Sequence, residues 1–363
     1  LPPERLENSM KLFQKLGSLC LAFTLALSAA SCSTGIVSSS SPSSSDASSS
    51  ESAVSQATES TPDDSSNAVT IRIGALKGPT GLGMLQLMQE AADGEKPYTF
   101  TLAGAADELT GKITTGELDA VALPTNSAAA LYQKTGGEIQ IAMVNTLGVL
   151  YLVTAGNESI SSVSDLAGKT VYSSGQGTVA QYAFEYILSA NGLEPGKDVT
   201  VEYKTEHSEI ATLMASGQAE IAVLPQPFVT QVTSQNADLK VALDLTEEWD
   251  KATGGASILT MGCLAVRRDF AQEHKDALDA FLEDYQSSVE FVNANPKEAA
   301  AISGEMDLIP AAVAEKAIPE CNIVYLDGAD MKEKLPGFLQ ILFDANPKSV
   351  GGAMPEDDFY YEK

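Results

Sequence analysis

The chain has 363 residues, of which 44% are hydrophobic, so it is long enough for two domains of ordinary size. Its formal net charge of −27 argues against a nucleic-acid-binding role, because phosphate groups demand a basic surface. The same charge argues against direct electrostatic adhesion to anionic lipid.

The first 31 residues predict an export signal. Lys11 and Lys15 form a basic start, and the apolar stretch Leu16–Ala30 follows. About 15 residues is too short for a membrane-spanning helix, which needs about 20, and is typical of a secretory signal. The small residues before Cys32 resemble a bacterial lipobox, which implies that Cys32 carries a lipid; the alternative is ordinary cleavage without a lipid.

Residues 32–68 are mostly Ser, with Thr, Ala, Pro and a few acidic residues, and contain no aromatic residue. Such a composition cannot bury enough apolar surface to offset its ordering entropy, so the sequence predicts a flexible tether. The folded body is expected to begin at about Val69.

Strands alternate with helices through most of the body, which predicts parallel-rich sheets covered by helices on both faces. From Asp269 onward the pattern is helical to the end of the chain. The predicted strands are Val69–Ala75, Tyr98–Leu102, Asp119–Leu123, Ile139–Val144, Val149–Val153, Val199–Tyr203, Leu239–Leu243 and Ile258–Val266, with a further strand before Gly175. The later helices are Phe270–Asn293, Pro296–Ile302, Ala311–Ile318 and about Ala329–Phe343.

Residues 108–126 and 209–227 carry one pattern twice, at an offset of 101 (209 − 108) without a gap. Each copy has a short helix, a Gly, a short apolar run and a Leu-Pro pair, with Gly116 aligned to Gly217. Chance recurrence is the alternative, but duplication explains all the aligned features together. The pattern therefore predicts two similar lobes.

The body resembles extracytoplasmic solute-binding proteins of ABC importers, in the branch that includes nitrate, sulfonate, taurine and thiamine-precursor receptors. The matching segments are DLAGKTVYSSGQGTVAQYAFEYIL at Asp165–Leu188, NTLGVLYLV at Asn145–Val153 and the two Leu-Pro turns. The resemblance implies a two-lobe α/β fold of the type II periplasmic-binding-protein class with a hinge. Lobe 1 would comprise residues 69–153 and 258–363, and lobe 2 residues 154–257.

The candidate solute contacts follow the predicted strands, at the edge where open α/β sheets bind ligands. Glycines let backbone N–H groups approach a ligand, and helix N-termini favour a negative group; simple helix capping is the alternative. The candidates in lobe 1 are Lys77, Gly78, Pro79, Thr80, Gly81, Thr125, Asn126, Asn145 and Thr146. Those in lobe 2 are Gly175, Gln176, Gly177, Thr178, Gln226, Pro227 and Phe228.

Other chemistry is weakly indicated. Cys263 and Cys321 form either one disulfide or two buried thiols. Glu206, His207 and Glu209 match no standard metal spacing, so capping is the better interpretation, and no metal or cofactor is predicted. The signatures GxSxG, HExxH and CxxC are missing, which argues against an enzyme.

The resulting hypothesis is a lipoprotein held by its anchor at the outer face of the bacterial cell membrane, passing a small solute to an ABC transporter permease. The solute is an anion, a zwitterion or a small heterocycle. A sensor lipoprotein using the same cleft, or an enzyme of this fold in menaquinone or thiamine-pyrimidine synthesis, are the alternatives.

Overall fold

A computed structural model describes residues 69–156 and 158–363, and these form part of one compact unit. The predicted signal peptide, Cys32 and the tether lie outside the described residues. Among the helices that the structure describes, none is long and apolar enough to cross a membrane.

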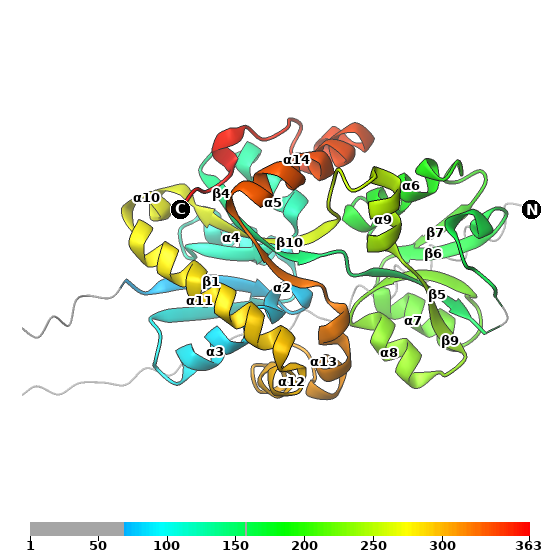
Figure 1. Ribbon diagram of the computed structural model, residues 1–363, viewed down its shortest axis with the longest axis horizontal. Helices are drawn as coiled ribbons and strands as arrows, with labels where there is room; N and C mark the ends of the chain where they lie inside the picture. The colour runs from blue at the N-terminus through cyan, green and yellow to red at the C-terminus, as the bar shows by residue number, and fades with distance from the viewer. Residues whose placement is uncertain (1–68, 157) are drawn as a thin grey trace, which may run out of the picture. The chain divides into compact units, whose positions relative to one another are not determined.

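The first lobe is built on a six-stranded sheet in the order β11-β4-β10-β3-β1-β2 (Figure 1). Its strands are β1 Ile71–Leu76, β2 Tyr98–Ala103, β3 Ala120–Leu123, β4 Ile139–Leu147, β10 Thr260–Arg267 and β11 Ile323–Leu326. β1 pairs in parallel with β2 and β3, whereas β10 is antiparallel to β3 and β4. The sheet is therefore mixed, with its parallel part next to the edge strand β2.

The second lobe has a five-stranded sheet in the order β7-β6-β8-β5-β9. Its strands are β5 Leu150–Ala155, β6 Thr170–Ser174, β7 Thr200–Lys204, β8 Ile221–Pro225 and β9 Leu239–Asp244. β6 pairs in parallel with β7 and β8, and β5 is antiparallel to β8 and β9. The order β2-β1-β3-β10-β4 in one sheet thus matches β7-β6-β8-β5-β9 in the other.

The sequence repeat is confirmed as a structural repeat. Helix α4 spans Ala106–Thr114 and helix α7 spans His207–Ala215, so both ends keep the offset of 101. Gly116 and Gly217 both have a positive φ, at 77° and 71°, which suits a residue without a Cβ directly after a helix. The Gly in each copy therefore stops its helix and turns the chain toward the next strand.

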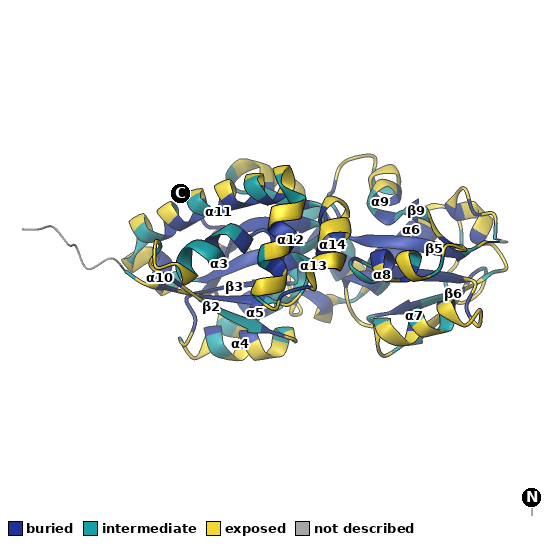
Figure 2. Cartoon of the chain, turned by 90° about the horizontal axis from the view of Figure 1, so that it is seen from below, coloured by how far each residue is buried: buried dark blue, intermediate teal, exposed yellow. Residues whose placement is uncertain are grey.

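Helices cover both faces of each sheet, as the alternation of buried side chains requires. In β3, Ala120 and Ala122 face a cluster that includes α3 and α11, whereas Val121 and Leu123 face a cluster that includes α5 and α14. Figure 2 shows buried strands between helices that are exposed on their outer sides. The remaining helices are α2 Pro79–Leu82, α3 Leu85–Ala92, α5 Thr125–Thr135, α6 Val179–Ala190, α8 Phe228–Gln235, α9 Leu245–Thr253, α10 Arg268–Glu273, α11 Lys275–Ala294, α12 Pro296–Glu305, α13 Ala311–Ala317 and α14 Gly328–Ala345. Short 3-10 turns span Val163–Leu166, Ile318–Glu320, Pro347–Val350 and Asp357–Phe359.

The chain passes between the sheets at Gly148, earlier than the predicted boundary after residue 153, because β5 already belongs to the second sheet. A Cβ on Gly148 would lie 2.2 Å from Thr246 Oγ1, so this crossing has no room for a side chain. The Asn322 side-chain amide donates to the Gly148 carbonyl at 2.6 Å. The return falls before β10, near the predicted position.

Two expectations about the C-terminal part are corrected. The region after Asp269 is not wholly helical, because Ile323–Leu326 forms β11 against β4. Cys263 and Cys321 are free buried thiols in different hydrophobic clusters, so the buried-thiol alternative holds. Burial raises the pKa of each thiol to about 12.

Candidate functional site

The predicted contact loops gather at one edge of each sheet. β1 and β3 are parallel, so the loop Lys77–Gly81 and the start of α5 at Thr125 follow carboxyl ends on the same edge. β6 and β8 are also parallel, which brings Gly175–Thr178 and Gln226 to the equivalent edge of the second sheet. This is where α/β sheets place ligand-binding loops.

In the first lobe, most of the predicted polar contacts are buried. Asn145 and Thr146 lie within β4, and they are 1% and 0% exposed. Asn145 Nδ2 donates to the Thr80 carbonyl and to Tyr285 Oη, each at 3.1 Å. Thr146 Oγ1 donates to Asn145 Oδ1 at 3.0 Å. Asn145 therefore connects the loop after β1 to the strand that leads to the second lobe.

Thr125 joins this network through Thr260. Its Oγ1 lies 3.0 Å from Thr260 Oγ1, and Thr260 also donates to the Thr146 carbonyl at 3.1 Å. Thr125 and Thr260 are both 0% exposed. In this arrangement the hydroxyl of Thr125 binds protein groups, so it holds the loop in place.

The network has a close-packed centre at Gly262. A Cβ there would lie 2.4 Å from Thr80 Cγ2 and 2.6 Å from Asn145 Oδ1. β10 also changes register against β4 on both sides of this residue. Only glycine fits between the loop Lys77–Gly81, called the contact loop below, and the buried amide of Asn145.

The remaining predicted residues of the first lobe, apart from the buried Gly81, lie nearer the surface. Lys77 is exposed and forms an ion pair with Asp307. Gly78 and Pro79 open α2, and Gly81 packs beneath Leu308. Asn126 Nδ2 donates to the Ser349 carbonyl at 3.2 Å.

In the second lobe, Gly175–Thr178 form the turn into α6. Gly175 and Gly177 have φ of 74° and 80°, a backbone region that favours glycine. Thr178 Oγ1 accepts from Ala180 N at 3.3 Å, so Thr178 is the N-cap of α6. Gln176 is exposed on this turn.

Gln226 caps the next helix. Its Oε1 accepts from Thr230 N at 3.2 Å and from Thr230 Oγ1 at 2.8 Å, and the side chain is buried. The Gln226-Pro227 peptide bond is cis. This turn places Phe228 at the first position of α8.

A contact that the sequence analysis missed joins Ser174, His207 and Phe228. Ser174 Oγ is hydrogen-bonded to His207 Nδ1, and the imidazole lies 5.0 Å from the Phe228 ring, centroid to centroid, at 44°. Burial lowers the pKa of His207. Among the described residues no carboxylate bonds this imidazole, so the pair lacks the third group that orients a catalytic base.

The two copies of the repeat differ at two positions of this cluster, and that difference could have indicated the cluster from the sequence. At the offset of 101, His207 aligns with Ala106 and Phe228 aligns with Ser127. The second copy therefore has an imidazole and an aromatic ring where the first copy has two small side chains. Glu206 and Glu209 flank the imidazole in sequence, but among the described residues no group of three His, Cys, Asp or Glu side chains is placed to hold a metal ion.

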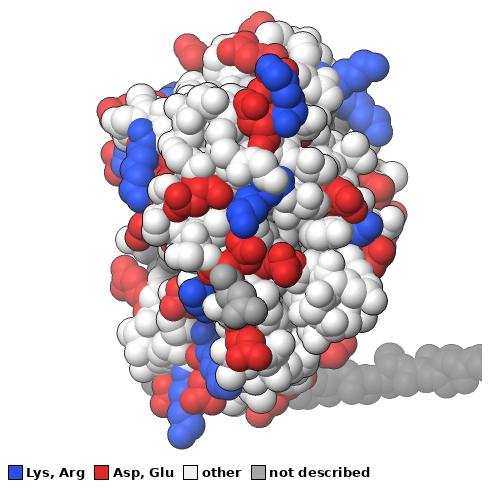
Figure 3. Space-filling model, turned by 90° about the vertical axis from the view of Figure 1, so that its right-hand side faces the viewer, with Lys and Arg blue, Asp and Glu red and all other residues white. Residues whose placement is uncertain are grey.

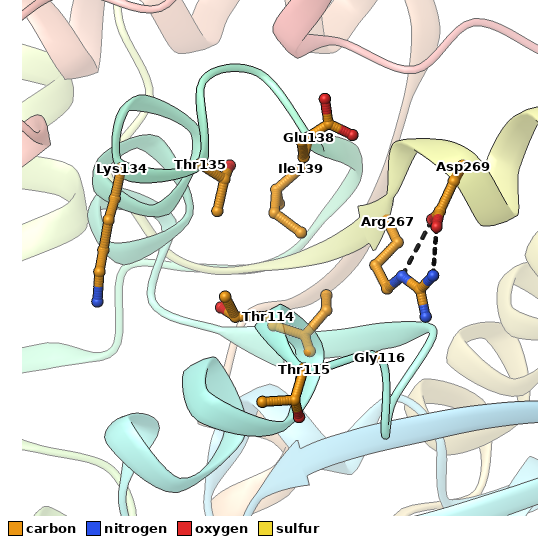
Figure 4. Close-up of a pocket in the computed structure, with 10 residues that line it drawn as sticks. Thr114, Thr115, Gly116, Lys134, Thr135, Glu138, Ile139, Arg267 and Asp269 are labelled. Carbon is orange, nitrogen blue, oxygen red and sulfur yellow. Dashed lines mark hydrogen bonds and ion pairs between the residues drawn. The ribbon is translucent and has the colours of Figure 1, made fainter.

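A pocket of about 430 Å³ lies elsewhere on the first lobe (Figure 4). Its lining includes Gly116, Lys134, Glu138 and Arg267, and Arg267 is paired with Asp269. Arg267 ends β10, which runs antiparallel to β3, so this pocket is at the amino end of β3. It contains none of the predicted solute contacts.

Charged side chains are dispersed on the face drawn in Figure 3, where acidic and basic groups alternate with uncharged surface. Among the described residues, several charged side chains form ion pairs, as Lys169 does with Glu158 at 2.8 Å. That face, apart from the atoms drawn in grey, presents no extended basic area.

Comparison with solved structures supports the fold. An ABC transporter protein from Parabacteroides distasonis matches with a TM-score of 0.69 and 24% identity, over 81% of this chain and 99% of its own. The periplasmic aliphatic sulphonate binding protein SsuA from Escherichia coli matches with a TM-score of 0.64 and 16% identity, over 80% and 92%. The periplasmic nitrate-binding protein NrtA from Synechocystis PCC 6803 gives 0.52 and 13%, over 78% and 84%.

A comparison with curated proteins finds no match. The family model described as "ABC transporter, phosphonate, periplasmic substrate-binding protein" matches residues 84–311, which is more than half of the chain. The match begins in the first lobe, spans the whole second lobe and ends at the start of α13. The chain therefore belongs to the family of phosphonate periplasmic substrate-binding proteins of ABC transporters.

Proposed function

We propose that this chain captures a small solute bearing an oxyanion group between its two lobes and delivers it to the permease of an ABC importer. The observation that carries the proposal is the pair of matching sheets, each with its polar loops at the carboxyl ends of its parallel strands. Duplicated lobes of this kind offer a ligand two facing sets of contacts.

The class of solute follows from the names of similar proteins and from the residues. The family is named for phosphonate, and similar structures are named for sulphonate and nitrate. All three groups present several oxygens that accept hydrogen bonds. Lys77 supplies a cation, and the turn before α6 lies at a helix N-terminus, which favours a negative group. Within this turn, the N–H groups of Gly177 and Thr178 donate to Gln181 Oε1 and to the Gly175 carbonyl.

We assign the side-chain contact of the second lobe to His207 and Phe228. No hydrogen bond to His207 Nε2 exists among the described residues, so this nitrogen is free to bind an oxygen of the solute. Phe228 supplies an apolar wall beside it. In the first lobe, Thr125, Asn145 and Thr146 act by holding the contact loop, since they are buried.

Calorimetric titration tests this function with methylphosphonate, ethanesulfonate and nitrate. At least one should bind, and His207→Ala should weaken that binding about twofold to tenfold, the value of a neutral hydrogen bond. His274→Ala is the matched control, because the His274 ring lies 5.1 Å from the Phe270 ring, centroid to centroid, in the first lobe. Equal losses in both variants would remove His207 from the site.

We also propose that Cys32 anchors the chain by a lipid at the outer face of the membrane, and that residues 32–68 act as its tether. The support is the basic start, the short apolar stretch and the small residues before Cys32. Labelling with a fatty acid should mark the unaltered chain and not Cys32→Ala. A label that persists on the variant would contradict the anchor.

A further inference from the structure

The ion pair between Lys77 and Asp307 joins two segments that are 230 positions apart in the chain. Lys77 directly follows β1 and is the only basic residue among the predicted solute contacts. Its backbone N–H donates to the Ala103 carbonyl at 2.9 Å, which fixes the base of the side chain at the carboxyl edge of the sheet. The ammonium group is thus held at this edge and neutralised by a carboxylate.

Asp307 is placed on Lys77 by a turn that is itself well anchored. Leu308 is buried against the contact loop, since a Cβ on Gly81 would lie 3.0 Å from Leu308 Cδ1. Ser303 Oγ donates to the Ile309 carbonyl at 2.9 Å and accepts from Ile309 N at 3.1 Å. The turn therefore stays in position whether or not the ion pair exists.

The backbone conformation at Asp307 is one that glycine adopts more readily than aspartate. Its φ is 54°, which glycine adopts readily, and only one other described non-glycine residue has a positive φ. The side chain is 92% exposed, so its packing does not account for an aspartate here. Among the residues that the structure describes, its one ion pair is with Lys77, and that contact accounts for the charge.

We propose that Asp307 is an internal competitor for the solute: its carboxylate occupies the Lys77 ammonium in the solute-free protein and is displaced by the anionic group of the solute. The inference rests on the proposed function. An exposed ion pair is weak and screened by salt, so an incoming anion exchanges with it at little cost. The pair thereby lowers the affinity of Lys77 for every anion by a small factor.

Replacement of the carboxylate tests the competition. Asp307→Asn keeps the shape and suits the positive φ, so it leaves the fold intact. It should tighten binding of whichever probe binds among methylphosphonate, ethanesulfonate and nitrate, by about twofold to fivefold at low salt, and less at high salt. Asp269→Asn, which makes the same charge change at the exposed Arg267 pair, is the control and should leave the affinity unchanged.

A double-variant cycle gives the decisive result. In a Lys77→Gln background, Asp307→Asn should have no effect, because no ammonium is left to release. An unchanged or weaker affinity of Asp307→Asn alone overturns the competition while the binding function stands. An equal gain in the Lys77→Gln background overturns it too. If none of the three probes binds the unaltered protein or Asp307→Asn, the proposed oxyanion function itself falls.

Discussion

Replacing Asn145 with Leu should destabilise the first lobe strongly. The change keeps the branched shape and the number of heavy atoms of the side chain but removes every hydrogen bond that the amide makes in the buried network. The hydroxyls of Tyr285 and Thr146, both 0% exposed, lose a partner in an apolar surrounding. Each buried group left without a partner costs about 1–3 kcal/mol, so these two hydroxyls alone should lower the free energy of unfolding by about 2–6 kcal/mol.

Thermal and urea unfolding measure this loss. Asn293→Leu is the matched control, because Asn293 is exposed and makes one hydrogen bond, to the Ile323 carbonyl at 2.9 Å. The control should lose about 0.5–1.5 kcal/mol at most. A loss in Asn145→Leu no larger than in the control would refute the network as the support of the contact loop.

Four further results are expected. Cys263 and Cys321 should resist alkylation in the native protein, as peptide mapping would show, because their raised pKa keeps them as thiols; rapid labelling would contradict their burial. Gly262→Ala should cost about 1–3 kcal/mol by overpacking, and a variant as stable as the parent in urea would show that the centre has room. Trp249, which is 0% exposed, should resist acrylamide quenching until the protein unfolds, and quenching of the native protein would place it at the surface. The lowered pKa of His207 means that the unfolded state binds its proton first, so stability should fall as pH drops below about 6.5 and this part of the fall should vanish in His207→Gln; identical pH profiles for both proteins would refute it.

The sequence predicted the duplicated lobes well, because the features of the repeat are local. A helix stop at Gly116, a short apolar strand and a Leu-Pro turn are each set by neighbouring residues, and both copies formed as expected. The antiparallel strand β5 was harder to place, because it pairs with β8 and β9, which follow much later in the chain. Which sheet receives β5 depends on this long-range pairing, which no local pattern records.

The candidate site shows the same limit. Position after a strand identified Thr125 and Asn145, but whether such a side chain faces solvent or a buried partner depends on residues as distant as Thr260 and Tyr285. The contact between Ser174 and His207 spans 33 positions, with α6 and β7 between them. Only a comparison of the two repeat copies would have indicated it.

The most direct test of solute binding uses the two histidines of the chain. Imidazole resonances in a ¹H–¹⁵N NMR spectrum can be assigned with His274→Gln and followed during titration with methylphosphonate, ethanesulfonate or nitrate. A solute held at the carboxyl edge of the second sheet should shift the His207 signals and leave those of His274 in place. Binding that leaves the His207 signals unmoved, or that moves both residues equally, would contradict the proposed site.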